Sequence, residues 1–122
     1  MIDWITKPVV LAIHEEQIAE HGGSSGVRDI ATLESVLAHP QQLQACGDKP
    51  DIAHLAAAYG FGIARSQPFI DGNKRTSYVV TATFLLLNGH DLRADEASRF
   101  QIWERLRARS LSEEKFAEWL SA

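Results

Sequence analysis

A ten-residue run near the middle of the chain gathers most of the side chains that could do chemistry. Residues 67–76 read Gln-Pro-Phe-Ile-Asp-Gly-Asn-Lys-Arg-Thr, and the run lies between two strongly apolar segments with helical periodicity. An acid, a glycine, an amide and two cations in succession are the groups that hold a phosphate and a divalent cation at the start of a helix. The run therefore predicts a site for a phosphorylated ligand.

Each polar residue of the run has its own expected part in that site. The first N–H groups of a helix have no partner within the helix, and the helix dipole is positive there, so an anion is stabilised. Gly72 would let the loop turn and let a ligand approach the backbone closely. Asn73, Lys74 and Arg75 would bind phosphate oxygens through amide and cationic N–H groups. Asp71 would hold Mg²⁺, which takes one or two carboxylates together with phosphate oxygens.

A plainer interpretation of the run is a tight turn at residues 71–72, an Asn cap and two solvated cations. Bare composition favours that interpretation, because short motifs often occur by chance. In the phosphate-site interpretation, Phe69 is expected to face inward and anchor the loop. The chain contains no Gly-Lys-Ser or Gly-Lys-Thr of a P-loop, and neither the His-Arg-Asp nor the Asp-Phe-Gly triplet of protein kinases.

The complete run resembles the motif of the Fic/Doc superfamily, His-Pro-Phe-x-Asp-Gly-Asn-(Gly or Lys)-Arg. Here it stands as Gln67-Pro68-Phe69-Ile70-Asp71-Gly72-Asn73-Lys74-Arg75, and every specified position but the first agrees. Upstream segments also resemble the small "death on curing" (Doc) branch: Leu11-Ala12-Ile13-His14, Gln17-Ile18, Gly22-Gly23 and Gly26-Val27-Arg28-Asp29. The resemblance extends over nearly the whole chain and implies an all-α fold, a compact Fic-type bundle.

The resemblance implies transfer of a group from Mg²⁺-ATP to a protein hydroxyl. In the family a histidine is the base, the acid matched by Asp71 holds the metal, and the residues matched by Asn73 and Arg75 bind phosphates. Most Fic members transfer AMP and carry Gly at the position of Lys74, whereas the Doc branch carries Lys and resembles a kinase that moves the γ-phosphoryl group. A bulky cation fills space that glycine leaves open, so the nucleotide can bind reversed. Lys74 therefore favours phosphorylation.

Gln67 departs from the motif, because it stands where the family has its histidine. A histidine near its usual pKa of about 6.5 accepts and returns a proton at neutral pH, and a carboxamide does not. Removing a general base costs about 10²–10⁴-fold in rate, whereas phosphate and metal binding are expected to persist. Gln67 is either an inactivating replacement, which the otherwise intact site favours, or a natural variant that binds without transferring. No other histidine is expected to take over the role: His14, His21, His39, His54 or His90.

The resemblance also implies partners. A Doc-type toxin acts within a toxin–antitoxin module, phosphorylates a translation factor (elongation factor Tu by resemblance) and so arrests translation. An antitoxin supplied in trans would lay an apolar helix face into a groove of the domain. Two alternatives stay open: a catalytically silent Fic-fold module that binds nucleotide or antitoxin, and a Fic-type AMP transferase.

Composition limits the other classes of protein. The chain has 122 residues, 45% of them hydrophobic, a net charge of −4 and one cysteine, Cys46. This length predicts a single domain over residues 1–122. A disulfide within the chain is impossible, and scattered Lys and Arg argue against direct nucleic-acid binding. No apolar stretch approaches the roughly 20 residues that span a bilayer, and the first residues do not resemble a signal peptide. A cytoplasmic protein with no membrane association is expected.

Periodicity predicts about six helices and no convincing strand pair. They run from Pro8 to His21, from Asp29 to the pair His39-Pro40, from Asp51 to just before Pro68, from Asn73 to the pair Asn88-Gly89, over residues 96–109, and after a capping box at residues 110–113. The fourth of these is apolar nearly all round and is therefore predicted to be the central helix, whereas the third is predicted to bury one face. Residues 41–49 are ambiguous, and residues 105–109 are expected to be solvated surface.

Overall fold

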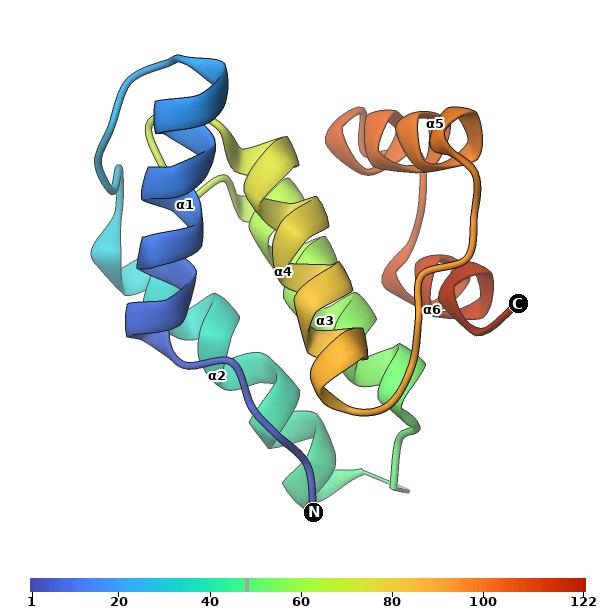
Figure 1. Ribbon diagram of the computed structural model, residues 1–122. Coiled ribbons are helices and arrows are strands. Elements are labelled where there is room, and N and C mark those ends of the chain that lie inside the picture. Colours follow the sequence, from blue (N-terminus) through green and yellow to red (C-terminus); the bar gives the residue numbers. More distant parts are fainter. Residues whose placement is uncertain (48) are drawn as a thin grey trace.

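Six α-helices make up the computed structural model, which describes residues 1–47 and 49–122 (Figure 1). They are α1 (Lys7–His21), α2 (Ile30–Cys46), α3 (Ile52–Ser66), α4 (Asn73–Leu87), α5 (Glu96–Arg107) and α6 (Glu113–Ser121). Within the described ranges the β-structure is an isolated antiparallel bridge between Val27 and Phe69. The predicted all-α fold of about six helices is confirmed. None of the described helices is long and apolar enough to cross a bilayer.

Short polar side chains start four of these helices by accepting a backbone N–H of the first turn. Asp29 and Asp51 cap α2 and α3 as expected, at 3.2 Å from the nitrogen of Thr32 and 2.9 Å from that of His54. Asp95 caps α5 in the same way. For α6 the cap is Ser112, bonded to the nitrogen of Lys115, two residues later than the predicted capping box.

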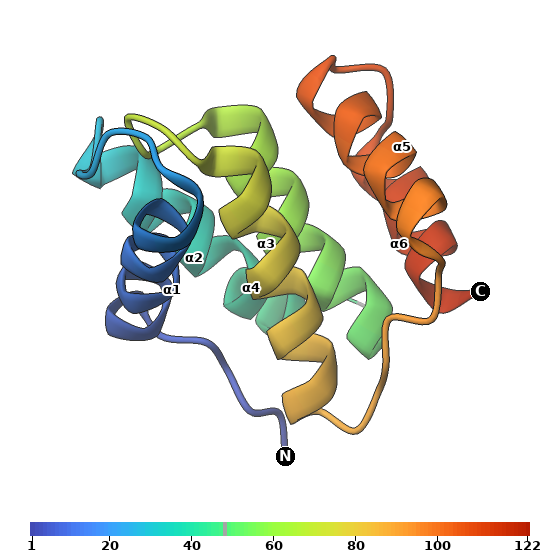
Figure 2. The ribbon, with the colours of Figure 1, turned by 45° about the horizontal axis from the view of Figure 1, so that its top comes forward.

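α3 and α4 form the central pair of helices, so the fourth helix is central as predicted, but α3 is buried on more sides than the sequence suggests. In Figures 1 and 2, α1 and α2 lie on one side of the α3–α4 pair, and α5 and α6 lie on the other. α3 packs against α2, α4, α5 and α6, whereas Leu86 and Leu87 at the end of α4 are 62% and 50% exposed. Small residues explain this packing: a Cβ on Gly60 would lie 2.2 Å from Oγ1 of Thr81, and one on Gly62 would lie 2.8 Å from Val36.

α2 continues to Cys46 instead of ending at Pro40, so this predicted boundary is wrong. A proline inside a helix removes one hydrogen bond and crowds the carbonyl four residues earlier. Pro40 is nevertheless buried on the same face as Leu33, Val36 and Leu37, and this face packs against α3. Tertiary packing therefore outweighs the local cost. Of the ambiguous segment 41–49, residues 41–46 are helical and Asp48 lies outside the described residues.

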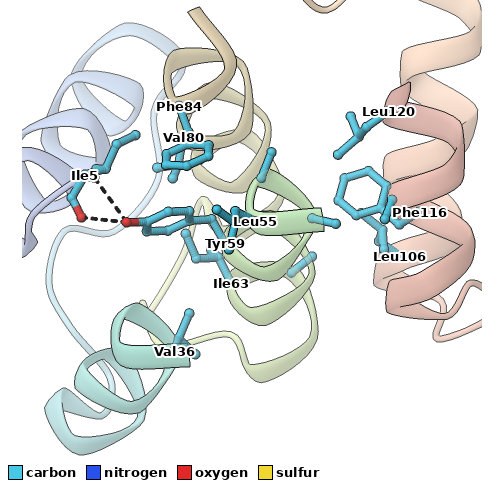
Figure 3. Close-up of a cluster of buried hydrophobic side chains, with 14 of the residues drawn as sticks. Ile5, Val36, Leu55, Tyr59, Ile63, Val80, Phe84, Leu106, Phe116 and Leu120 are labelled. Carbon is cyan, nitrogen blue, oxygen red and sulfur yellow. Dashed lines mark hydrogen bonds between the residues drawn. The ribbon is translucent and has the colours of Figure 1, made fainter. Parts of the chain in front are cut away.

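The core has two parts on either side of α3 (Figure 3). On one side the Tyr59 hydroxyl donates to the carbonyl oxygen of Ile5 and accepts its N–H, both at 3.1 Å, and the Tyr59 ring lies 5.0 Å from that of Phe84. Burial raises the pKa of Tyr59, so the hydroxyl stays protonated. On the other side Phe116, Leu106 and Leu120 from α5 and α6 face α3. The N-terminal segment is thus fastened to the middle of the fold.

One surface contact makes stability depend on pH. His54 places Nδ1 2.7 Å from a carboxylate oxygen of Asp51 and Nε2 3.2 Å from one of Glu114 on α6. The hydrogen bond to Asp51, followed by that to Glu114, raises the pKa of His54 above its usual value. The stabilisation is therefore complete below the unfolded-state pKa of about 6.5 and is lost as pH rises through the raised pKa.

We expect His54→Gln to remove this pH-dependent part of the stability. Because the His54 side chain is 36% exposed, solvent screens the pairs and the effect is at most about 1 kcal/mol. Thermal unfolding at pH 6 and pH 8.5 measures it: the parent protein should lose more stability than the variant between the two. His21→Gln, at an exposed histidine on α1, is the control. An equal loss in the parent and His54→Gln would contradict the assignment.

Candidate functional site

The run singled out by the sequence forms the loop between α3 and α4. Gln67 ends α3 in the left-handed region (φ 49°, ψ 61°), and Gly72 starts α4 with φ 75°. The N–H of Thr76 bonds the Gly72 carbonyl, so the N–H groups of residues 73–75 form the free first turn of α4. A cavity of about 290 Å³ lies at this turn. It is lined by Ala64, Gln67, Ile70, Asp71, Gly72, Asn73, Lys74, Arg75 and Arg107. All six residues that the sequence assigns to the site therefore line one cavity.

Phe69 anchors the loop as predicted. Its side chain is 1% exposed and its ring stacks on that of His14, with 3.9 Å between centroids and 7° between planes. The Asn73 side chain completes the anchor: Oδ1 accepts the N–H of Phe69 and Nδ2 donates to the Phe69 carbonyl, both at 3.0 Å. Two of the hydrogen-bonding positions of the Asn73 amide thus brace the loop, and its second N–H makes no hydrogen bond within the described residues.

The connection between α1 and α2 lies beside the α3–α4 loop (Figure 2), and its backbone contacts Asp71. The N–H of Ile70 bonds the carbonyl of Gly26 at 3.1 Å, next to the bridge between residues 27 and 69. The N–H of Ser24 donates to Oδ2 of Asp71 at 3.2 Å, and Nε2 of His14 lies 2.8 Å from the Asp71 carbonyl oxygen. Gly23 is required for this approach, because a Cβ there would lie 2.7 Å from Oδ2 of Asp71.

Arg28 holds the backbone at position 67. Its Nε donates to the carbonyl of Gln67 at 2.8 Å, and its Nη2 donates to the carbonyl of Ser66 at 2.9 Å. These are end carbonyls of α3, where a cation is also favoured by the helix dipole. The two hydrogen bonds of the Arg28 guanidinium therefore fix the backbone of Gln67, whose side chain lines the cavity.

Arg28→Ala is expected to lower the free energy of unfolding by about 1–2 kcal/mol, since two hydrogen bonds from a cation are lost. Arg28→Lys should recover part of the lost stability, because it keeps the positive charge but lacks the paired N–H donors of the guanidinium. Chemical denaturation measures both, with Arg93→Ala at an exposed position as the control. Equal stability of Arg28→Ala and the control would show that the two bonds contribute nothing.

The two cations of the run, Lys74 and Arg75, have different surroundings at the cavity. Nζ of Lys74 donates to Oε1 of Glu104 and lies 4.8 Å from the ring centroid of Phe100. Glu104 also accepts from Nη2 of Arg107 at 2.9 Å, and the bonds from Arg107 and then Lys74 lower the pKa of Glu104 to about 2. Arg75 is exposed, and its side chain makes no hydrogen bond within the described part of the chain.

Several residues that support the site were not predicted from the sequence. His14 and Arg28 lie in the segments that carry the family resemblance, so that signal could have found them. Glu104 and Arg107 gave no such signal, and residues 105–109 were expected to be plain solvated surface. Arg107 is indeed exposed, but its side chain also reaches the cavity.

The donor set fits a magnesium ion held jointly with a phosphorylated ligand. Within residues 1–47 and 49–122 no group of three or more His, Cys, Asp or Glu could hold a metal by itself. Mg²⁺ is commonly bound by one or two carboxylates plus phosphate oxygens. Each Asp71 carboxylate oxygen accepts one backbone N–H, from Gly72 at 2.9 Å and from Ser24, and keeps a further lone pair.

Comparison with known proteins decides the family. Residues 4–85 match the model of the Fic/DOC family. The chain belongs to the Fic/DOC family. In this Fic/DOC chain the matched residues include α1 to the greater part of α4 and the whole α3–α4 loop, whereas α5 and α6 follow the matched part.

Two curated relatives are Doc proteins, which confirms the resemblance to the Doc branch. "Toxin Doc" of Mycolicibacterium smegmatis (strain ATCC 700084 / mc(2)155) is 40% identical over 75 residues, 61% of this chain and 58% of the relative. "Protein kinase doc" of Escherichia phage P1 is 31% identical over 85 residues, 70% of this chain and 68% of the relative. The match thus spans less than two thirds of the first relative and slightly more than two thirds of the second.

Proposed function

We propose that this Fic/DOC chain is a Doc-type toxin whose site is built to transfer the γ-phosphoryl group of Mg²⁺-ATP to a hydroxyl of a translation factor, and that Gln67 leaves this copy severely impaired. One observation carries the proposal: the acid, the glycine, the amide, both cations and position 67 all line one cavity at the start of α4. The names of the two Doc relatives support the toxin and the kinase parts.

Phosphate binding is the part of the activity that this chain retains. The free N–H groups of the first turn of α4 and its positive dipole end attract phosphate oxygens. Arg75 is free to grip them in a bidentate manner, and Lys74 lies one residue before it on the same turn. Asp71 is the group that would hold Mg²⁺, which when bound neutralises the charge that develops on the transferred group.

The transfer step needs a base at position 67. The substrate hydroxyl oxygen forms a bond to the γ-phosphorus, the bond from that phosphorus to the β,γ-bridging oxygen breaks, ADP leaves, and the hydroxyl proton must go to an acceptor. Arg28 fixes the backbone of residue 67 so that its side chain lies at the cavity. A histidine there would accept the proton, whereas the Gln67 carboxamide has no basic group at neutral pH.

Lys74 supports transfer of the γ-phosphoryl group over transfer of AMP. Its long side chain lines the cavity and is hydrogen-bonded to Glu104, so it occupies space that a glycine would leave to the nucleotide. The chain as it stands would still bind nucleotide without transferring it, in the manner of a silent module. By the naming of the mycobacterial relative as a toxin, we also propose an antitoxin as a partner in trans and a cytoplasmic place of action.

A paired transfer assay tests the proposal. The chain and Gln67→His would each receive Mg²⁺-ATP labelled at the α or the γ position, together with a translating cell extract. We expect label from the γ position on a translation factor, and only with histidine present. Transfer of label from the α position would mean that the protein is an AMP transferase and not a kinase. If neither protein transfers label, the silent binding module would be favoured.

A further inference from the structure

The cavity at the start of α4 has a second wall, which comes from α5. Arg107 in the last turn of α5 lines the same cavity as Asn73, Lys74 and Arg75 from α4. α5 follows residues 4–85, the part that matches the family model, so the motif does not account for this wall. A polyanion in the cavity would face cations from two helices.

One carboxylate holds the two walls together. Glu104 accepts from Nζ of Lys74 through Oε1 and from Nη2 of Arg107 through Oε2. The positive charges of Lys74 and Arg107 would otherwise repel each other. The negative carboxylate between them offsets this electrostatic repulsion. Because a guanidinium has five N–H donors and the structure gives one of those of Arg107 to Glu104, further donors are available at the cavity.

We infer that Arg107 binds the phosphate chain of the ligand, and that Glu104 is a positioning residue that holds Arg107 beside Lys74 at the cavity. The inference rests on the proposed function, because it adds a residue to that phosphate site. A guanidinium at the same cavity as the first N–H groups of α4 would add bidentate, charge-assisted hydrogen bonds to those that the helix start offers.

The competing explanation is purely structural. Arg107 and Glu104 are three residues apart on one helix, and a cation in the last turn of a helix is favoured by its dipole. An exposed pair of this kind contributes little to stability, and it would have no effect on a ligand. Binding measurements therefore separate the two explanations.

Titration calorimetry with inorganic tripolyphosphate measures the phosphate site without any transfer chemistry. We expect Arg107→Ala to weaken binding roughly tenfold to a hundredfold, as for loss of a charge-assisted hydrogen bond, and to reduce the dependence of the affinity on salt. Arg107→Lys should fall between. The control is Arg105→Ala, since Arg105 lies on the same helix and donates to the Ser110 carbonyl at 3.2 Å instead of lining the cavity. It should bind like the parent.

Three results would overturn the inference or a part of it. If the parent binds tripolyphosphate and Arg107→Ala binds it equally well, Arg107 has no part in the site and the proposed function stands. If the parent does not bind tripolyphosphate, both the inference and the proposed phosphate site fail. For Glu104, the penalty of Arg107→Ala should shrink in a Glu104→Gln background, and an unchanged penalty would refute the positioning role.

Discussion

Gln67→His is expected to raise the rate of phosphoryl transfer about 10²–10⁴-fold over the chain as it stands, the usual contribution of a general base. The rest of the site needs no change, because Asp71 and the cations already line the cavity next to position 67. The variant should also arrest the growth of cells that express it without an antitoxin. Single-turnover transfer and growth of an induced culture are the two measurements.

The pH profile separates a true base from a general improvement of the site. A histidine base acts unprotonated, so the rate of Gln67→His should rise with pH through a pKa of about 6.5 and then level off. Gln67→Ala is the matched control, and it should show neither the gain nor the profile. Healthy cells and an unchanged rate with histidine at this position would end the toxin interpretation.

Phe69→Ala is expected to lower the free energy of unfolding by about 3–5 kcal/mol, which is the usual cost of removing a buried phenyl ring. The ring is 1% exposed and stacks on His14, whose Nε2 lies beside the Asp71 carbonyl. Loss of the ring should therefore also loosen the acid that would hold the metal. Chemical denaturation measures the stability, and calorimetry with tripolyphosphate measures the site.

Phe69→Leu provides the comparison, because it keeps most of the apolar volume and should cost less than half as much. The stack on His14 is lost in both variants, so a shared loss of ligand binding would point to the stack, and a loss confined to alanine would point to the cavity left in the core. Unchanged stability in Phe69→Ala would contradict the description of Phe69 as the anchor of the loop.

Local features of the chain were predictable from its sequence, and the candidate site is largely local. Residues 71–75 are adjacent, so a turn followed by a helix start is enough to bring them to one cavity. Helix caps such as Asp29 and Asp51 are local for the same reason. The residues that join distant segments were not predictable: Arg28 meets residue 67 and Glu104 meets residue 74 only through the packing of whole helices.

The greater burial of α3, which the sequence did not predict, has a similar cause. Sequence patterns give weight to large apolar side chains, and these are concentrated in α4, where Leu86 and Leu87 nevertheless remain exposed. Which of the two central helices is buried on more sides depends instead on how closely the other helices can approach its backbone. Gly60 and Gly62 allow α4, α6 and α2 to approach the backbone of α3, and a hydrophobic pattern does not register the absence of a side chain.

The left-handed backbone at Gln67 has a consequence for the evolution of this protein. Histidine is among the residues enriched several-fold in that region, and glutamine is not, so the residue that the proposed transfer would require also suits the backbone conformation at this position better. Either glutamine codon becomes a histidine codon by one change in its third base. A gene that encodes Gln67 is therefore a single base change from the histidine motif, and the transfer activity proposed above would return in that one step.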